Sequence, residues 1–237
     1  MDLRYVYPET DVPTLHLPDA ILASVPRDTL CQVLIDLRTY WARNSEMACR
    51  SRIDAIILEA LATSGVEITC FAEVKNEWMG PGYGYTGAVD YMIGSAPTMD
   101  AVDDIDSFIL VVEAKREWPD NSVAQVLAEA GCLLKKRMEN GKNTPVFAML
   151  TNAYLFQFFA IDVDGIVYCS GPPCVLGLGP DGTYATSHSL LLILRWLRWF
   201  ISCMAAISPR VSAEDLSVDM IVTSLSAIRG SFGPRSQ

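Results

Sequence analysis

The sequence predicts an α/β protein in which helices cover both faces of a central mixed sheet. Apolar residues recur at helical spacing through residues 28–63, and the pattern then changes to the short apolar runs of strands through residues 66–115. One more helical pattern separates these strands from two later ones. Strands on either side of a helix are typical of a sheet whose faces carry helices. A three-layer α/β/α fold is therefore expected.

Two helices are expected at the start of this order. The first runs from about residue 28 to 43, and the second from Ser45 to about residue 63. Ser45 is suited to cap the second helix, and Gly65 is suited to stop it. Residues 1–26 contain four prolines and predict an irregular arm laid on the domain.

Strands, a helix, two more strands and an apolar helix follow. Each strand is a run of β-branched and aromatic residues bounded by turn residues, and Asp120, Asn121 or Ser122 could cap the helix after the third strand. The expected strands cover residues 66–74, 85–94, 107–115, 144–152 and 154–165, and the expected helices cover about 123–138 and the region around 190.

At 237 residues, 51% apolar and 19% charged, the chain is expected to form one globular domain. Its formal net charge of −10 repels phosphates at long range, so a nucleic acid would have to be held by a local basic groove. This charge argues against tight nonspecific DNA binding. It is compatible with a nuclease that binds its metal through carboxylates.

The cysteines and the N-terminus predict an intracellular protein, in the cytoplasm or the nucleus. Seven scattered cysteines, an odd number, are not a disulfide framework. The first 20 residues carry an early acid and three prolines before residue 19, with no continuous apolar run that would serve as a signal peptide.

Residues 189–207 are apolar and about as long as a bilayer span. Arg195 and Arg198 lie three residues apart in the middle of this segment, so both charges fall on one helix face, which would be costly at the centre of a bilayer. A buried helix or one face of a homodimer is therefore favoured over a membrane span.

Residues 82–89, GYGYTGAV, formally match the glycine pattern of dinucleotide and kinase phosphate loops. A dinucleotide loop follows a strand and opens a helix, whereas these glycines open a predicted strand. No H-R-D or D-F-G sequence follows, which argues against a kinase. A hairpin turn is the expected structure, and Tyr83 and Tyr85 remain candidates to stack on a nucleic-acid base.

Histidine and cysteine chemistry has little support. His16 and His188 are the only histidines, and neither has the accompanying signature of a Ser-His-Asp relay or a zinc site. Cys169 and Cys174 form one pair without a second, which indicates ordinary reduced cysteines.

The remaining candidates are the charges in and after two predicted strands. Glu113 and Lys115 lie two residues apart and point to the same side, while Ala114 turns away. Antiparallel pairing would place Asp90 of the preceding strand close to them. Two carboxylates and the Ala114 carbonyl would form an oxygen site that suits Mg²⁺ or Mn²⁺, beside a lysine that orients a water. The alternative is a surface Glu/Lys pair at a strand end.

This arrangement resembles the PD-(D/E)xK nuclease superfamily, which has the restriction-endonuclease-like fold. Asp90 stands at the family's metal-binding Asp, Glu113 at its Glu and Lys115 at its catalytic Lys. Gln125 stands at the glutamine that many members carry in the next helix. Val89 departs from the pattern, because the usual residue before the Asp is Pro. The wording around these residues also looks like stand-alone fungal members, including the nuclease-like parts of Crinkler-type effectors.

The resemblance covers about residues 45–160, the expected nuclease-like core. Residues 1–44 would form an N-terminal arm and helix, and residues 161–237 a C-terminal extension with the apolar helix. The resemblance implies hydrolysis of phosphodiester bonds in DNA or RNA with Mg²⁺ or Mn²⁺. A nuclease-derived effector or binding module without catalysis is the alternative, motivated by the acidic composition and the lack of a recognisable DNA-reading domain.

The family usually adds an acidic residue from the first core helix. The inward apolar stripe of the helix over 45–63 extends back through Arg50 to Glu46, whereas Glu59 falls off this stripe. Glu46 is therefore favoured, with Arg50 as its partner, and an ordinary surface pair is the alternative. The densest basic segment, which contains Lys135, Lys136 and Arg137, is read as a phosphate contact or as a solvated helix end.

Overall fold

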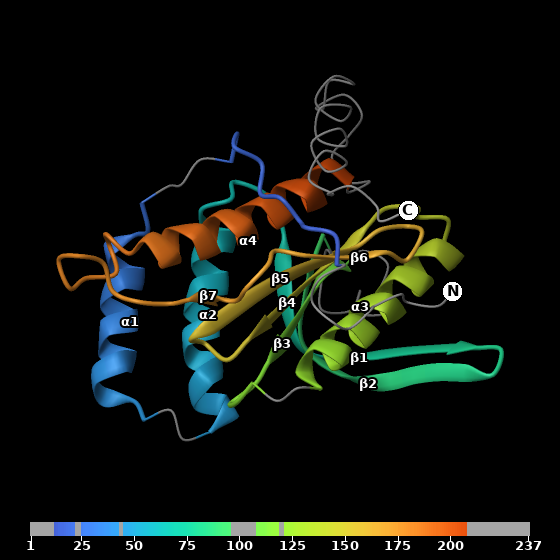
Figure 1. Ribbon diagram of the computed structural model, residues 1–237, viewed down its shortest axis with the longest axis horizontal. Coiled ribbons are helices and arrows are strands. Elements are labelled where there is room, and N and C mark those ends of the chain that lie inside the picture. The colour runs from blue at the N-terminus through green and yellow to red at the C-terminus, as the bar shows by residue number, and fades with distance from the viewer. Residues whose placement is uncertain (1–11, 22–24, 43–44, 96–107, 119–120, 208–237) are drawn as a thin grey trace.

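The computed structural model describes residues 12–21, 25–42, 45–95, 108–118 and 121–207 (Figure 1). These residues form an α/β protein with a seven-stranded mixed sheet and four helices. In chain order the elements are α1 (Asp28–Tyr40), α2 (Glu46–Ala62), β1 (Thr69–Gly80), β2 (Tyr83–Gly94), β3 (Phe108–Ala114), α3 (Ser122–Glu139), β4 (Val146–Thr151), β5 (Leu155–Ile161), β6 (Val167–Cys169), β7 (Cys174–Val175) and α4 (His188–Ile207).

The sheet runs in the order β1-β2-β3-β4-β5-β6, and β7 pairs with β5. Strands β3 and β4 are parallel and the other pairs are antiparallel, because α3 carries the chain from the end of β3 back to the start of β4. All seven residues of β3 are buried. A strand covered on both faces has no solvent side, which explains its continuous apolar sequence.

Helices pack on both faces of the sheet. Figure 1 shows α1, α2 and α4 on one face and α3 on the other, and the two buried apolar clusters divide in the same way. The face under α4 is aromatic: Phe200 stacks on Phe147 with ring centroids 4.4 Å apart, and Trp196 stacks on Phe158 at 5.3 Å. These contacts make α4 part of the core.

The two arginines of α4 are tied to the rest of the chain. Arg195 donates to the carbonyl of Ile21 at 2.8 Å, and Arg198 donates to the hydroxyl of Thr63 at 3.1 Å. Within the described ranges, no helix combines the length and the apolar character that crossing a membrane requires. Most of the large apolar side chains of α4 are buried in this core. Homodimerisation through α4 stays a prediction.

Several local predictions are confirmed. Ser45 caps α2, with its hydroxyl accepting from the Ala48 amide at 3.2 Å. The β1–β2 hairpin turns at residues 81–82, where Gly82 has a φ of +87° that an L side chain would strain. From the arm, Leu15 donates its amide to the Cys169 carbonyl at 2.8 Å, so its described part lies against β6. All seven cysteines are free thiols.

Other local predictions need correction. The expected cap of α3 is absent at Asn121, whose side chain makes no capping hydrogen bond. Helix α1 ends at Tyr40, and β1 continues six residues beyond its predicted end at residue 74. The acidic loop before β3 lies outside the described residues, as do residues 1–11 and 208–237 of the predicted arm and C-terminal extension.

Candidate active site

The pairing of β2 with β3 places two carboxylates at one level of the sheet. Tyr91 pairs with Val112, so Asp90 directly precedes this pair on β2 and Glu113 directly follows it on β3. Both carboxylates are buried, with Asp90 8% and Glu113 2% exposed. The sequence prediction that antiparallel pairing brings them to one site therefore agrees with the register.

Asp90 is held by two donors from different elements. Its Oδ2 accepts from the main-chain amide of Ala114 at 2.7 Å, and its Oδ1 accepts from the guanidinium of Arg50 on α2. Arg50 also contacts Glu46 at 3.3 Å and Glu73 at 3.0 Å. Glu46 therefore forms the predicted pair with Arg50, and it lies beside Asp90 because Arg50 contacts both carboxylates.

The hairpin is irregular beside Asp90. Ladder pairing of β1 with β2 stops at Tyr91 and resumes at Val89, and Glu73 of β1 has a φ of +54°. A positive φ is uncommon for residues other than glycine. The distortion turns Glu73 toward Arg50, and no feature of the sequence had predicted Glu73 there.

Glu113 contacts two other predicted site residues, Lys115 and Gln125. Its Oε1 contacts the ammonium of Lys115 and accepts from the side-chain amide of Gln125 at 2.7 Å. The main-chain amide of Lys115 donates to the Thr151 carbonyl at 2.9 Å, which fixes the chain where it leaves β3. Lys115 and Gln125 therefore meet at one carboxylate. Strand spacing predicted that Glu113 and Lys115 share a side, and the family resemblance implied that Gln125 supports the site.

Glu129 is the residue that sequence reasoning missed. It lies on α3 one turn after Gln125, is fully buried, and accepts from Gln125 at 3.1 Å and from the Tyr85 hydroxyl at 3.1 Å. Its position four residues after Gln125 places both on one helix face, which is the signal that could have identified it. The hydroxyl of Tyr85 is therefore bonded within this cluster.

Burial and mutual repulsion hold protons in this cluster. Burial, followed by the charge of Glu129, raises the pKa of Glu113 to about 8. Burial also raises the pKa of Glu129 and of Asp90, although hydrogen bonds and Arg50 oppose the rise. Two buried carboxyls that share the Gln125 amide cannot both ionise cheaply, so we infer that the Glu113–Glu129 pair retains a proton near neutral pH.

Lys115 stays charged. Burial alone would lower its pKa, but the contact with Glu113 and the charges of Glu113, Glu46 and Asp90 raise the pKa overall. An ammonium at neutral pH donates hydrogen bonds and offsets negative charge; it does not accept a proton. This restricts what Lys115 can do in a reaction.

The cluster carries more negative than positive charge. Five carboxylates, those of Glu46, Glu73, Asp90, Glu113 and Glu129, face the two cations Arg50 and Lys115, a formal excess of three negative charges when all are ionised. Among the described residues, no hydrogen-bond partner reaches the buried Oε2 atoms of Glu113 and Glu129. An uncompensated buried carboxylate oxygen is costly unless a proton or a cation satisfies it.

A divalent cation fits this chemistry. Asp90, Glu113 and the Ala114 carbonyl would offer the hard oxygen ligands that Mg²⁺ and Mn²⁺ prefer, and Mg²⁺ commonly keeps several waters beside one or two carboxylates. Within the described ranges, no three His, Cys, Asp or Glu side chains form a complete metal cluster. The ligand set would therefore have to include the carbonyl or water.

The residues predicted to contact nucleic acid lie in different environments. Arg137 is a correction, because it is buried and donates to the Phe108 carbonyl at 2.8 Å and to Thr144 at 2.7 Å, which makes it part of the core and not a phosphate contact. Lys135 lies 5.8 Å from the centre of the Trp78 ring, and Lys136 is half-buried on the same helix. The side chain of Tyr83 lies outside the described residues.

Glu59, the alternative to Glu46 as the site acid of α2, lies elsewhere. Glu59 is 1% exposed and pairs with Arg27, whose Nε lies 2.7 Å from its Oε2. Glu59 therefore joins α2 to the start of α1, and Glu46 is the acid of α2 that reaches the cluster through Arg50.

We expect Glu113→Gln to flatten the loss of stability with rising pH in metal-free protein. A carboxyl whose folded pKa is raised stabilises the fold fully below its ordinary pKa of about 4.5, and this contribution is lost as pH rises through about 8. The neutral amide has no such loss. Urea unfolding in EDTA at pH 5 and pH 8 should show a smaller decrease in the free energy of unfolding for the variant than for the wild type.

The matched control is Glu67→Gln, which removes an exposed carboxylate and should keep the wild-type decrease. A decrease as large in Glu113→Gln as in the wild type would show that Glu113 is not the group responsible.

The sequence was also compared with known proteins. Neither protein-family models nor curated proteins gave a match to this chain.

Proposed function

We propose that this protein is a metal-dependent nuclease that hydrolyses phosphodiester bonds of DNA or RNA, with a restriction-endonuclease-like core. The observation that carries the proposal is the meeting of Asp90, Glu113, Lys115 and Gln125 at the carboxyl end of a buried central strand. One buried oxygen of Glu113 has no hydrogen-bond partner in the part of the chain that the structure describes. Stable folds rarely keep converging buried charges without a ligand or a chemical use for them.

Asp90, Glu113 and the Ala114 carbonyl would hold Mg²⁺ or Mn²⁺. The bound ion would supply an activated water and stabilise negative charge on the phosphoryl group. Arg50 and the Ala114 amide hold the Asp90 carboxylate in place before any cation arrives, so its position is already fixed. Gln125 does the same for Glu113.

Lys115 would act through its charge. Its Nζ would donate a hydrogen bond to the attacking water and offset the charge that develops on the phosphoryl oxygens. Because its raised pKa keeps it protonated, it would not serve as the base that takes the proton of the water. Glu46 and Glu129 would support the site from either side, through Arg50 and Gln125 respectively.

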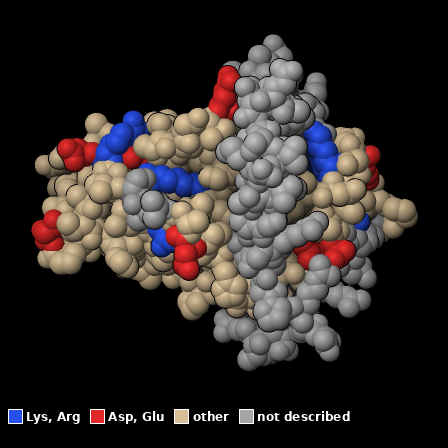
Figure 2. All heavy atoms as spheres, turned by 90° about the horizontal axis from the view of Figure 1, so that it is seen from above, with Lys and Arg blue, Asp and Glu red and all other residues tan. Residues whose placement is uncertain are grey.

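Nucleic acid would have to approach against the overall charge. On the face seen in Figure 2, Lys and Arg side chains of the described residues lie in small separate groups among acidic ones. Binding by such a surface would depend on local contacts and on the cation at the site.

We expect the protein to cleave nucleic acid only in the presence of a divalent cation. Supercoiled plasmid, single-stranded DNA and single-stranded RNA would each be incubated with Mg²⁺ or Mn²⁺, and products followed on gels. EDTA and the Asp90→Asn variant should each abolish cleavage, because both remove the metal from the site. Identical products with EDTA or with Asp90→Asn would overturn the proposal, as would the absence of products from all three substrates.

A second candidate is a nuclease-derived module that binds nucleic acid or protein without catalysis. The observation in its favour is that Arg50 and Lys115 already neutralise part of the Asp90 and Glu113 charge without a metal. Nucleic-acid binding that is unchanged by EDTA, with no products, would favour this candidate.

A further inference from the structure

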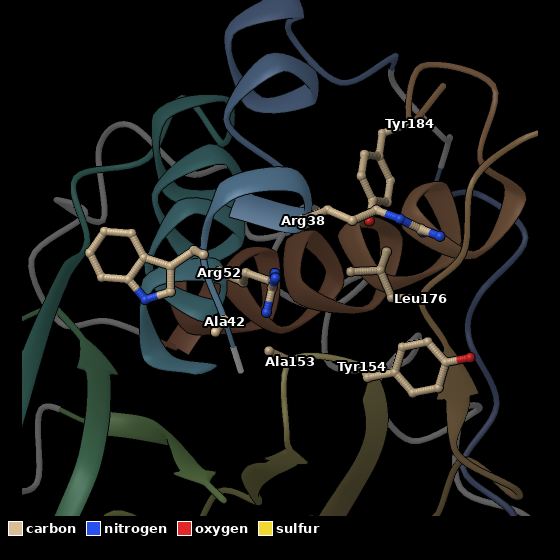
Figure 3. Close-up of a pocket in the computed structure, with 8 residues that line it drawn as sticks. Arg38, Ala42, Arg52, Ala153, Tyr154, Leu176 and Tyr184 are labelled. Atoms are coloured by element: carbon tan, nitrogen blue, oxygen red, sulfur yellow. The ribbon is translucent and has the colours of Figure 1, made fainter. Parts of the chain in front are cut away.

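A hollow lies at the same end of the sheet as the candidate site, on the other side of α2. It has a volume of about 390 Å³, within the range of small-molecule pockets, about 300–1,000 Å³. It lies between the end of α1, the middle of α2, the β4–β5 turn and the segments that flank β7 and precede α4 (Figure 3). Its lining residues are Arg38, Trp41, Ala42, Arg52, Ala153, Tyr154, Leu176 and Tyr184.

The lining combines two guanidinium groups with three aromatic rings. None of the lining residues is acidic, in a chain whose formal net charge is −10. Figure 3 shows Arg38 alongside Tyr184 and Leu176, and Arg52 near Ala42 and Ala153. The hollow is therefore a local basic site of the kind that an acidic protein needs to hold an anion.

Two of the three aromatic residues that line this hollow are exposed to solvent. Trp41 is 53% exposed and Tyr154 is 44% exposed, while Tyr184 is buried in the wall. Large aromatic side chains left open around a concave surface are typical of binding sites. A ligand with both a planar ring and an anionic group would match the rings and the guanidinium groups together.

The β4–β5 turn that carries Tyr154 is held in a defined shape. Asn152 accepts from the amides of Tyr154 at 3.0 Å and Leu155 at 2.7 Å, and Ala153 has a φ of +65°. A non-glycine residue in this region is strained, and such strain concentrates at functional sites. The same turn begins at Thr151, whose carbonyl accepts the amide of Lys115, so it connects the hollow to the candidate active site.

The two arginines of α2 are also divided between the sites. Arg50 faces Asp90, and Arg52 lies two residues later, about 200° around the helix, where it lines the hollow and donates to the Leu37 carbonyl at 2.6 Å. One turn of α2 thus carries one arginine that contacts the candidate active site and one that lines the hollow.

We propose that this hollow binds a nucleoside phosphate, with the phosphate at Arg38 and Arg52 and the base against the rings of Trp41 and Tyr154. The ligand would be either a free nucleotide or an unpaired nucleotide of a nucleic-acid strand. The second source rests on the proposed nuclease function, because it places the nucleotide on a strand that also reaches Asp90 and Glu113. The binding itself does not depend on catalysis.

The test uses the full chain in EDTA, so that no cleavage can occur. Calorimetry would measure binding of adenosine 5′-monophosphate, of a 5′-phosphorylated single-stranded hexanucleotide and of inorganic phosphate. We expect the first two to bind, and inorganic phosphate to bind more weakly than either. Arg38→Gln and Trp41→Leu should each weaken nucleotide binding about five-fold or more, since a base-stacking or charge contact is lost.

Two matched controls lie outside the hollow. Tyr40→Leu removes an aromatic ring next to Trp41 that is 82% exposed, and Lys75→Gln removes an exposed positive charge of β1. Neither should change binding. Thermal melting of every variant would confirm folding.

Stronger binding of the hexanucleotide than of the mononucleotide, lost in Arg38→Gln, would identify a strand; equal binding of both would identify a free nucleotide. The proposal is overturned if neither nucleotide binds at millimolar concentration, or if the hollow variants bind as the wild type does. Nucleotide binding that responds to Arg38 in a protein without nuclease activity would keep this inference and reject only the nuclease.

Discussion

Lys115→Ala is expected to lower the rate of nucleic-acid cleavage about a hundred- to a thousand-fold, the usual effect of removing one donor that stabilises charge in a transition state. The reason is electrostatic: the Lys115 ammonium lies against Glu113 and keeps its proton at neutral pH, so it is the only lysine placed in the described carboxylate cluster. Single-turnover cleavage of a labelled oligonucleotide in saturating Mg²⁺ would measure the rate of the chemical step.

The matched control is Lys75→Ala, which removes an exposed lysine of β1 and should leave the rate unchanged. Lys115→Arg separates charge from shape, because it keeps the charge but not the compact ammonium, and it should recover part of the rate. A Lys115→Ala protein that cleaves at the wild-type rate would contradict the role proposed for this residue.

Mg²⁺ is expected to raise the melting temperature of the wild type by about 5 to 10 °C when its concentration is about 100-fold above the dissociation constant. The physical basis is the excess negative charge of the cluster and the buried Glu113 oxygen, which has no hydrogen-bond partner within the described ranges. Thermal melting with and without Mg²⁺ at pH 8, where competition from the Glu113 proton is weakened, would measure the shift.

The same shift should be largely lost in Asp90→Asn and kept in Glu67→Gln, which alters an exposed carboxylate outside the cluster. Each comparison is made within one variant, with and without Mg²⁺, so a change in the stability of the metal-free protein does not enter. Equal shifts in the wild type and in Asp90→Asn would show that Mg²⁺ binds elsewhere.

The parts of the fold that periodicity controls could be predicted from the sequence. The continuous apolar run over 108–112 identified a strand covered on both faces, and Ser45 identified the start of α2. The short strands β6 and β7 could not be predicted, because two or three residues carry no period and take their strand form from pairing with β5. Pairing of this kind depends on tertiary context.

Some features of the candidate site could likewise be predicted from local sequence, and others depend on tertiary packing. Spacing within a strand predicted that Glu113 and Lys115 share a side, and chain order predicted that Asp90 lies near them. The bond from Arg50 to Asp90 and the turn of Glu73 toward Arg50 depend on how α2 crosses the hairpin, which no local pattern records. Glu129 is an intermediate case, since its helical spacing from Gln125 was visible in the sequence.

Arg137 shows why charge runs mislead. Its neighbours Lys135 and Lys136 are half-buried at the surface of α3, whereas Arg137 is buried in the core and donates to the Phe108 carbonyl and the Thr144 hydroxyl. A run of three basic residues spans most of a helix turn, so its members face different environments. The run therefore cannot act as one phosphate-binding surface.

The most direct test of the central claim is the position of a divalent cation. Crystals of the protein soaked in Mn²⁺ would be measured at a wavelength where manganese scatters anomalously. The proposed function predicts an anomalous peak about 2.1 to 2.3 Å from carboxylate oxygens of both Asp90 and Glu113, on the side of the Ala114 carbonyl. A manganese peak elsewhere, with no peak between Asp90 and Glu113, would contradict it.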